Sequence, residues 1–250
     1  MNDETPPATP APYPHHLPIV TEHAPPVVVA PPTPILRGEE PLGHGPFAII
    51  EGLLKSPASV LDAIQRGDGA LWKLSALVVC SMVVTGLVMA AFAGGLQLVW
   101  VPIKLSLGIF FCAIICLPSL YIFSSLAGAE QSLRETWGAL LMGVSLVGVL
   151  LVGFAPVSWV FSQATSSASF MGGMHIVFLL ISSYFGLGLI KRALAAANGR
   201  PLKGTALWSL LFLLVVLQMT TTLRPLVGEF DGELFHDKQF FVAHWIENLG

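Results

Sequence analysis

Charged residues are the scarcest component of this sequence, since Asp, Glu, Lys and Arg make up only 11% of its 250 residues. Soluble globular domains average about 25%, so the shortage argues against a water-soluble core of this length. The few basic residues form no run, and the formal net charge is only -3. We therefore expect no nucleic-acid partner, because such partners are bound by basic patches.

Motifs that mark an enzyme or a nucleotide site are also missing. The sequence has no Walker-type loop and no Gly-x-Gly-x-x-Gly pattern, so we expect no bound nucleotide. The long apolar stretches contain no Asp or Glu, and their serines lack a base that could activate a nucleophile. We expect no catalytic residue. A proton pump or an ion-coupled carrier is disfavoured, because such proteins depend on buried ionisable groups.

The three cysteines, Cys80, Cys112 and Cys116, all fall within apolar segments. Cys112 and Cys116 are spaced to share one helix face, but a metal site would need further ligands that the neighbourhood lacks. We predict that all three are small buried hydrophobic residues. We also predict that the protein has no metal and no other cofactor.

Apolar residues, by contrast, make up 54% of the sequence and give it a mean hydropathy of +0.75. We predict an all-α, polytopic transmembrane bundle of about five helices, in residues 71–93, 96–126, 138–161, 174–190 or slightly beyond, and 205–222. Each stretch is about long enough for a hydrocarbon layer of roughly 30 Å. Stretch 96–126 is too long for one upright span, so we expect its first turns in the interface and its span over residues 103–124. Two spans there, the alternative, would require turns of almost no length.

Lys and Arg in the short connections set the expected orientation. With five spans, eight of them share the side of the N-terminus and three lie on the other side, so the N-terminus is expected in the cytoplasm and the C-terminus outside. Tryptophans at span ends fit an aromatic belt. Lys104, which follows Trp100 by one helical turn, is expected to extend its ammonium to water. The predicted membrane-interface residues are Trp72, Trp100, Lys104, Trp137, Trp159, Trp208 and Trp245.

The segments beside the spans divide the rest of the chain. Thirteen of the 19 prolines lie between Pro6 and Pro46, so residues 1–45 are expected to form a disordered, Pro-rich cytoplasmic tail. Residues 46–68 are predicted to form amphipathic interfacial helices, with Ser56 as an N-cap before a helix-starting proline. Packing on a soluble partner or on the underside of the bundle is the alternative. Residues 69–223 form the five-helix transmembrane domain.

Residues 224–250 are predicted to form an amphipathic tail outside the membrane, with several aromatic residues on one face. Three roles are open for that face. It rests on the outer leaflet, caps the bundle, or binds a partner.

Small residues recur every fourth position in three of the predicted spans, and such stripes allow two helix backbones to approach closely. The predicted helix-packing residues are Gly86, Ala90, Gly94, Ala139, Gly143, Ser182 and Gly186. Packing within one bundle is the simpler interpretation, and a dimer or partner surface is the alternative. Pro118 and Pro156 are expected to kink the second and third spans.

A Pro-rich tail, the stretch from Leu53 through Ser56-Pro57 to Ile64, and five closely spaced spans together resemble the Yip1 family. The resemblance covers about residues 48–222 and includes a polar connection, Ala127–Thr136, between the second and third spans. For a bacterial-type member it implies a non-enzymatic scaffold or organiser in the cytoplasmic (inner) membrane.

The resulting hypothesis is a membrane scaffold or accessory subunit that binds protein or lipid partners without catalysis. Its expected partners are membrane lipids and either another protein or a second copy of the chain. The alternative is permease-like transport of a neutral or lipidic small molecule past the kinks at Pro118 and Pro156.

Overall fold

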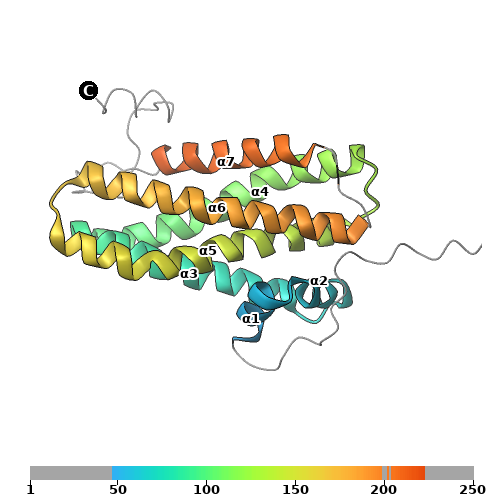
Figure 1. The fold of residues 1–250 in the computed structure, drawn as a ribbon, viewed down its shortest axis with the longest axis horizontal. Helices are drawn as coiled ribbons and strands as arrows, with labels where there is room; N and C mark the ends of the chain where they lie inside the picture. Colours follow the sequence, from blue (N-terminus) through green and yellow to red (C-terminus); the bar gives the residue numbers. More distant parts are fainter. Residues whose placement is uncertain (1–46, 199–201, 203, 223–250) are drawn as a thin grey trace, which may run out of the picture. The chain divides into compact units, whose positions relative to one another are not determined.

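The computed structural model describes residues 47–198, 202 and 204–222, all within the unit formed by residues 33–250. This described part is entirely helical, with seven helices and no strand (Figure 1). Four of its helices are long and apolar enough to cross a membrane. The prediction of an all-α protein of the membrane type is confirmed. The predicted tails, residues 1–45 and 224–250, and with them Trp245, lie outside the described residues.

Two short helices come first, α1 (Ala48–Lys55) and α2 (Pro57–Arg66). Pro57 starts α2, where its missing N–H costs no helical hydrogen bond. Ser56 occupies the N-cap position as expected, but its side chain makes no capping hydrogen bond. The helix ends at Gly67, whose φ of 88° lies in the left-handed region that glycine adopts without strain.

The apolar sides of these two helices are buried. Leu53 of α1 is 2% exposed, and Val60 and Ile64 of α2 are fully buried in the main hydrophobic core. α1 contacts α3 and α5, and α2 contacts α3, α5 and α6. Both helices therefore pack on the underside of the protein's own bundle, which is one of the alternatives that the sequence leaves open.

The four long helices form two hairpins. α3 (Ala70–Ala93) is followed by α4 (Gln97–Leu126), and α5 (Leu133–Ala164) is followed by α6 (Ala168–Asn198). At 1.5 Å per residue, α3 is about 36 Å long and the other three are about 45–48 Å long. The last helix, α7 (Thr205–Thr222), has 18 residues and a length of about 27 Å, slightly less than a hydrocarbon layer.

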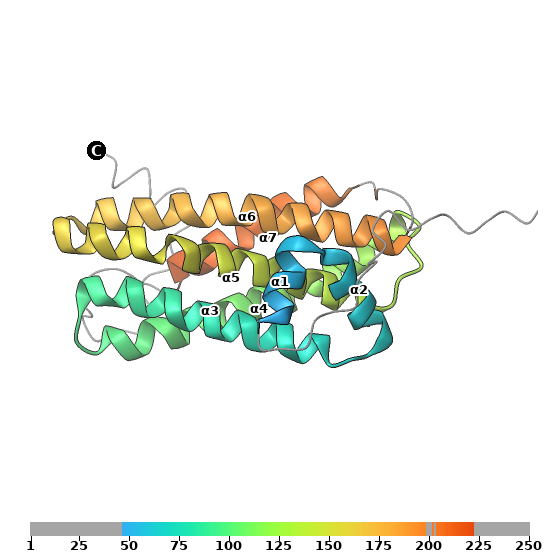
Figure 2. The same ribbon diagram turned by 60° about the horizontal axis from the view of Figure 1, so that its bottom comes forward.

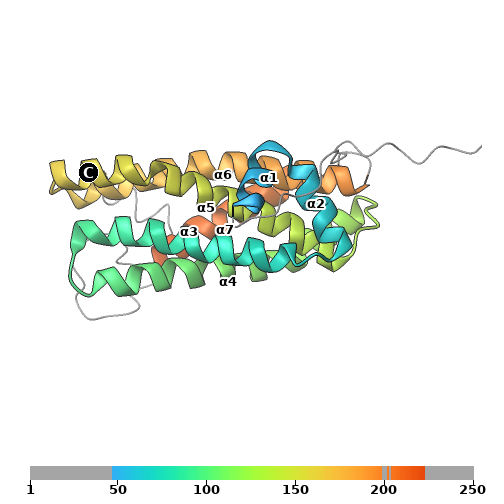
Figure 3. The same ribbon diagram turned by 90° about the horizontal axis from the view of Figure 1, so that it is seen from below.

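Within the described part, α5 is the central helix. It packs along α3 and α6, while α4 packs against α3 and α7. Figures 1 to 3 place the α3–α4 and α5–α6 turns at one end of the bundle and α2 and the α4–α5 connection at the other, with α1 next to α2 on the side toward the middle. We call the first the hairpin end and the second the base.

The helices can be compared with the predicted spans one by one. α3 matches the first predicted span to within one residue, and the long stretch 96–126 is one helix rather than two. α5 and α6 extend beyond the predicted spans 138–161 and 174–190 at both ends. α7 coincides with the fifth predicted span, 205–222, but it is a shorter apolar helix and is not among the four candidate crossings.

Burial changes along α5. Near the base, every residue from Gly138 to Gly148 is buried. Beyond Gly148 only Leu151, Ala155 and Ser158 are buried, while Val160 is 63% exposed. The central helix is therefore enclosed on all sides from Gly138 to Gly148 and on one side beyond Gly148.

Candidate functional site

One close approach of two backbones joins α5 to α6 at Gly143 and Gly186. A Cβ atom on Gly143 would lie 2.7 Å from the Gly186 carbonyl oxygen and would overlap the Ile190 side chain. A Cβ atom on Gly186 would meet the Gly143 carbonyl oxygen at 2.7 Å and overlap Val147. Both predicted packing residues therefore form one crossing inside the bundle, where only glycine fits without movement.

A second crossing joins α3 to α4. A Cβ atom on Gly86 would lie 2.6 Å from the Cα atom of Pro102, so the two backbones touch there. Ala90, one turn further along α3, is fully buried and packs in a small apolar cluster with Val101 of α4. Both residues therefore lie in the contact between α3 and α4.

Gly94 does not line this crossing, although it follows the same spacing. It ends α3 with a φ of 70°, and a Cβ atom there would meet nothing within 4 Å. Its role is to let the chain leave the helix, which requires the left-handed conformation. The prediction of a packing role for Gly94 is wrong.

The remaining two predicted packing residues are buried. Ala139 of α5 is 1% exposed and belongs to the main core. Ser182 of α6 is fully buried, and its Oγ atom has no hydrogen-bond partner among the described residues.

Two further glycine contacts of α5 are not found by a search for small residues at every fourth position. A Cβ atom on Gly138 would lie 2.7 Å from a methyl carbon of Ile64 in α2, and one on Gly148 would overlap Ser81 of α3. Gly138, Gly143 and Gly148 are five residues apart, so they turn to successive sides of the helix. A search for any recurring glycine, rather than for one face, would have found them.

Four of the predicted interface tryptophans lie near helix ends and keep surface exposed. Trp72 is 78% exposed at the start of α3, and Trp159 is 50% exposed near the end of α5. Trp100 is 39% exposed, and Trp137 is partly buried against the core. Side chains of this kind suit a membrane interface, because their rings have an apolar body and a polar tip.

Trp208, in contrast, is a core residue of the contact between α4 and α7. It is 1% exposed and stacks on Phe212 at a ring-centroid distance of 5.3 Å. Its indole Nε1 donates to the Ser119 hydroxyl at 3.1 Å and lies 3.4 Å from the Cys116 carbonyl oxygen. The prediction of an interface role for Trp208 is wrong, because its N–H finds its partners inside the bundle.

Lys104 also differs from its prediction. The residue is 7% exposed, and its Nζ atom has essentially no accessible surface. The ammonium group therefore does not extend to water, although neighbouring Ile103 and Leu107 are exposed on α4. The side of α4 that carries Lys104 is covered at this height.

The cysteines are placed mostly as predicted. Cys112 and Cys116 are buried at 1% and 5% exposure on one side of α4, where Cys112 approaches the Val215 carbonyl oxygen of α7. Cys80 is exposed on α3, so the prediction that it is buried is wrong.

A buried polar cluster, which sequence reasoning missed, connects three helices at the base. The Gln131 amide donates to Ser124 at 3.1 Å and to Thr136 at 3.0 Å, and its oxygen accepts from Asn198 at 2.7 Å. Asn198 in turn accepts from the backbone N–H of Glu130 at 3.1 Å. We call these five residues the base cluster. It fixes the α4–α5 connection to the last turn of α6.

The start of α5 is fixed next to this cluster. Ser132 and Glu135 form a reciprocal capping box, with the Glu135 N–H donating to the Ser132 hydroxyl and the Ser132 N–H donating to the Glu135 carboxylate. Glu135 also accepts from the Gln65 amide of α2 at 3.1 Å. The signal was visible in the sequence as Ser-x-x-Glu before an apolar run.

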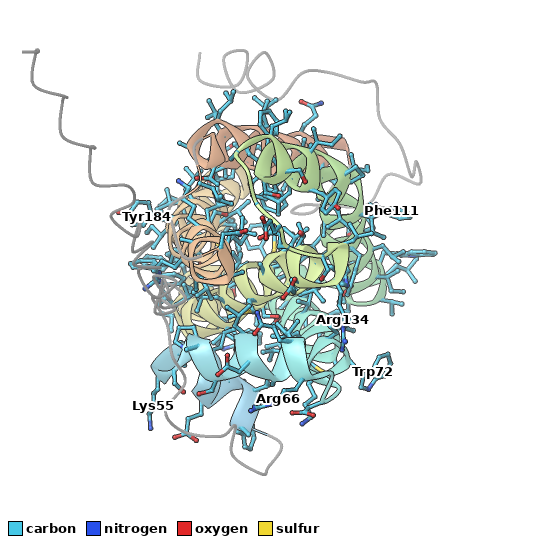
Figure 4. All side chains as sticks on the ribbon, turned by 90° about the vertical axis from the view of Figure 1, so that its right-hand side faces the viewer. Lys55, Arg66, Trp72, Phe111, Arg134 and Tyr184 are labelled. Carbon is cyan, nitrogen blue, oxygen red and sulfur yellow. The ribbon has the colours of Figure 1, made fainter. Side chains whose placement is uncertain are left out.

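The base also presents an exposed surface on α1, α2 and the neighbouring helix starts (Figure 4). Phe47 is 73% exposed and Leu54 is 55% exposed. The Lys55 ammonium donates to the Glu51 carboxylate at 2.8 Å; this hydrogen bond and the charge attraction lower the pKa of Glu51 and raise that of Lys55. The surface therefore combines apolar side chains with charged ones.

Among the described residues, no group of three or more His, Cys, Asp or Glu side chains is placed to hold a metal ion. His175 of α6 lies 2.7 Å by its Nδ1 atom from the Met171 carbonyl oxygen of its own helix. No protein-family model, no curated protein and no solved structure matches the chain. The Yip1-like resemblance therefore stays a prediction.

Proposed function

We propose that the protein is a membrane scaffold or accessory subunit that binds protein or lipid partners and carries out no catalysis. In this proposal α7 is a fifth span, the base faces the cytoplasm, and the C-terminus lies outside. The membrane is the bacterial cytoplasmic membrane, as the Yip1-like resemblance implies.

The burial of α5 is the observation that carries the proposal. Every residue from Gly138 to Gly148 is buried, and close contacts at Gly143 and Gly148 leave no space even for a methyl group. A transport pathway through the bundle would need a lining of accessible side chains at this height. A tightly packed centre supports a role that depends on the outer surface.

The two prolines predicted to kink these helices support the same choice. Pro118 and Pro156 are both exposed, so they face away from the interior of the described bundle. A permease that passed a molecule along these two prolines would carry it over the surface of the helices. The permease alternative therefore gains no support from them.

The exposed surface of the base is where the proposal expects a partner. The glycine crossings are used within the bundle, whereas Phe47 and Leu54 remain exposed beside charged residues of α1. Large apolar side chains surrounded by polar ones are typical of protein contacts.

Photo-crosslinking in intact membranes tests this expectation. A photoreactive amino acid at Leu54 should form a discrete protein adduct in the full chain. The same amino acid at the adjacent Leu53, which is 2% exposed, is the matched control and should react only within the chain. The two positions share their location and expression, so a difference reports on the exposed side of α1.

Two results would count against the scaffold. One is the absence of a protein or lipid adduct at both Phe47 and Leu54. The other is protein-dependent flux of a neutral solute or a lipid in vesicles that contain only the purified chain, which would favour the permease.

The fifth span is tested separately by labelling cysteines introduced at exposed connections. Glu130→Cys at the base and Ser166→Cys at the hairpin end should react with an impermeant maleimide from opposite sides of the membrane. With α7 as a span, Glu247→Cys should react from the side of Ser166→Cys. Reaction from the side of Glu130→Cys would reduce the protein to four spans.

A further inference from the structure

One side of α3 carries a line of exposed residues that begins with a cation at the base. The line consists of Lys73, Cys80, Val84 and Leu87, whose spacing places them one above another on the same side of a helix. All four are exposed, Val84 and Leu87 at 42% each. The other side of α3 packs into the main core. We call these four residues the outer stripe.

The outer stripe has the length of one lipid leaflet. Leu87 lies 14 residues beyond Lys73, or about 21 Å at 1.5 Å per residue, whereas half of a hydrocarbon layer is about 15 Å thick. α3 is one of the four helices that are long and apolar enough to cross a membrane. An acyl chain of the leaflet on the base side therefore fits along the stripe, with its headgroup at the height of Lys73.

A second cation lies at the same end of α3. The Arg134 guanidinium of α5 lies against Gly67, where a Cβ atom would be 3.2 Å from the Nη2 atom. Gly67 belongs to the short connection between α2 and α3, and this connection leads into the first turn of α3, which carries Trp72 and Lys73. Figure 4 shows Trp72 and Arg134 on the same side of the base.

The two cations are available to a partner from outside the bundle. Both are exposed, and within the described part of the chain neither Lys73 nor Arg134 forms an ion pair. The neighbouring carboxylates are engaged elsewhere, since Asp68 accepts from Arg66 at 3.2 Å and Glu135 closes the capping box of α5. Exposed cations of this kind attract phosphate oxygens, and a guanidinium binds them through two parallel N–H groups.

Trp72 lies beside these cations. Its ring is 78% exposed in the first turn of α3, next to Lys73. Tryptophan prefers the interface between headgroups and hydrocarbon, because its ring is apolar and its N–H is polar. The corner therefore offers cations, an amphipathic ring and an apolar stripe, which match the phosphate, the glycerol region and the acyl chain of a phospholipid.

We propose that this corner binds an anionic phospholipid of the leaflet on the base side. Lys73 and Arg134 bind the headgroup phosphate, Trp72 packs beside the glycerol region, and one acyl chain lies along the outer stripe. A zwitterionic headgroup brings a cation of its own, which Lys73 and Arg134 repel, so the site selects lipids with a net negative charge. The lipid site rests on the membrane placement in the proposed function, but it requires no protein partner.

Cys80 provides a native position for the test, because it is exposed on the outer stripe while Cys112 and Cys116 are buried. A bimane fluorophore is attached to Cys80 in the full chain, and a Cys80→Ser chain treated in the same way is the blank. The protein is placed in bilayers in which either phosphatidylglycerol or phosphatidylcholine carries brominated acyl chains. Bromine quenches the fluorophore at short range, so the two quenching curves give the preference of the stripe for one lipid over the other.

The expected preference for phosphatidylglycerol is about tenfold or more, because each cation near a membrane surface strengthens the binding of an anionic lipid about fivefold. Lys73→Gln combined with Arg134→Gln should reduce the ratio to about one. Each single substitution should lower it about fivefold. The single variants decide the question if the double variant does not fold.

Two control variants separate the site from the overall charge of the protein. Lys55→Gln removes one cation from α1, on the opposite side of the base from Trp72 in Figure 4, and should leave the ratio unchanged. Exchanging the cations, as Lys73→Arg with Arg134→Lys, keeps both charges and should keep a ratio of about fivefold or more.

Equal quenching by the two lipids in the unsubstituted chain would overturn the proposal, as would a ratio that the double neutral variant leaves unchanged. A decrease for Lys55→Gln as large as that for Lys73→Gln would also overturn it, since the preference would then follow net charge alone. Weak quenching by both lipids would show that protein covers the outer stripe, which contradicts the proposal as well. None of these results affects the photo-crosslinking at Leu54, so the proposed function is decided by a separate measurement.

Discussion

The two halves of the bundle differ in how the central helix is used. Near the base, α5 is surrounded by α2, α3 and α6, and glycines mark its contacts with each of them. Toward the hairpin end, Gly153 has nothing within 4 Å of a Cβ position and Pro156 is exposed. The same helix therefore acts as a core element in one half and as one arm of a hairpin in the other.

This difference shows how glycine acts in a membrane bundle. In lipid, apolar side chains gain little by leaving their surroundings, so helices associate through close packing. Gly143 and Gly148 provide that closeness, whereas Gly153 has the same residue type and no neighbour. A glycine indicates a crossing only where a second backbone or side chain is present to use it.

Among the tests of this comparison, the largest effect is expected when single tryptophans are replaced by alanine. Trp208→Ala removes a fully packed indole and its hydrogen bond to Ser119, and it should destabilise the protein by about 3 kcal/mol or more. Trp159→Ala, at a half-exposed site near the hairpin end, should cost well under half as much. Unfolding midpoints in detergent measure both, and similar losses would remove the distinction between the two ends.

A smaller loss is expected at the α5–α6 crossing. Gly143→Ala places a methyl group against the Gly186 carbonyl oxygen and Ile190, and such overpacking should cost about 1–3 kcal/mol. Gly153→Ala is the matched control on the same helix. It has free space and should stabilise the helix by about 0.5–1 kcal/mol. If both variants shifted the unfolding midpoint in the same direction, the difference between the two halves of α5 would be refuted.

Disrupting the base cluster should lower the free energy of unfolding by about 1–2 kcal/mol. Gln131→Leu leaves the Asn198 amide and the hydroxyl groups of Ser124 and Thr136 without their present partner, and unsatisfied buried groups carry a cost of this size. Hydrogen exchange should increase in the α4–α5 connection and in the last turn of α6. Gln163→Leu, at an exposed site near the hairpin end, should leave exchange in both segments as it is. Equal exchange in the two variants would argue against the cluster.

The smallest effect is expected from the helix starts. Ser132→Ala removes one half of the α5 capping box and should cost about 1 kcal/mol. Ser167→Ala removes a single hydrogen bond of 3.3 Å to the Phe170 N–H at the start of α6, where no reciprocal bond is recorded among the described residues. Its loss should be smaller. The order of the two unfolding midpoints checks this, and a larger loss at Ser167 would contradict it.

Composition and periodicity were sufficient to predict the helices. The start of α3, the single helix over 97–126 and the bounds of α7 follow from apolar length and from Gly and Pro at the ends. The full lengths of α5 and α6 could not be predicted, because hydropathy reports where lipid begins and not where a helix stops. Helices held by neighbours continue beyond the apolar segment.

Neighbours also explain the residues that were misplaced. A tryptophan at a helix end suits an interface and a core equally well, and Trp208 is in the core because Ser119 and Cys116 of α4 lie opposite. Lys104 was expected to reach water because Trp100 stands one turn before it. The burial of Lys104 depends on which segment covers one side of α4, and the spacing of residues in the sequence does not reveal that segment.

The base cluster has a consequence for the order in which the chain is assembled. Gln131 and Asn198 are 67 residues apart, so their hydrogen bond forms only after the whole α5–α6 hairpin has been synthesised and inserted. Until then the Gln131 amide needs water or another partner. The α4–α5 connection is therefore fixed only when the α5–α6 hairpin is complete. A chain whose synthesis stops earlier exposes this connection to proteases.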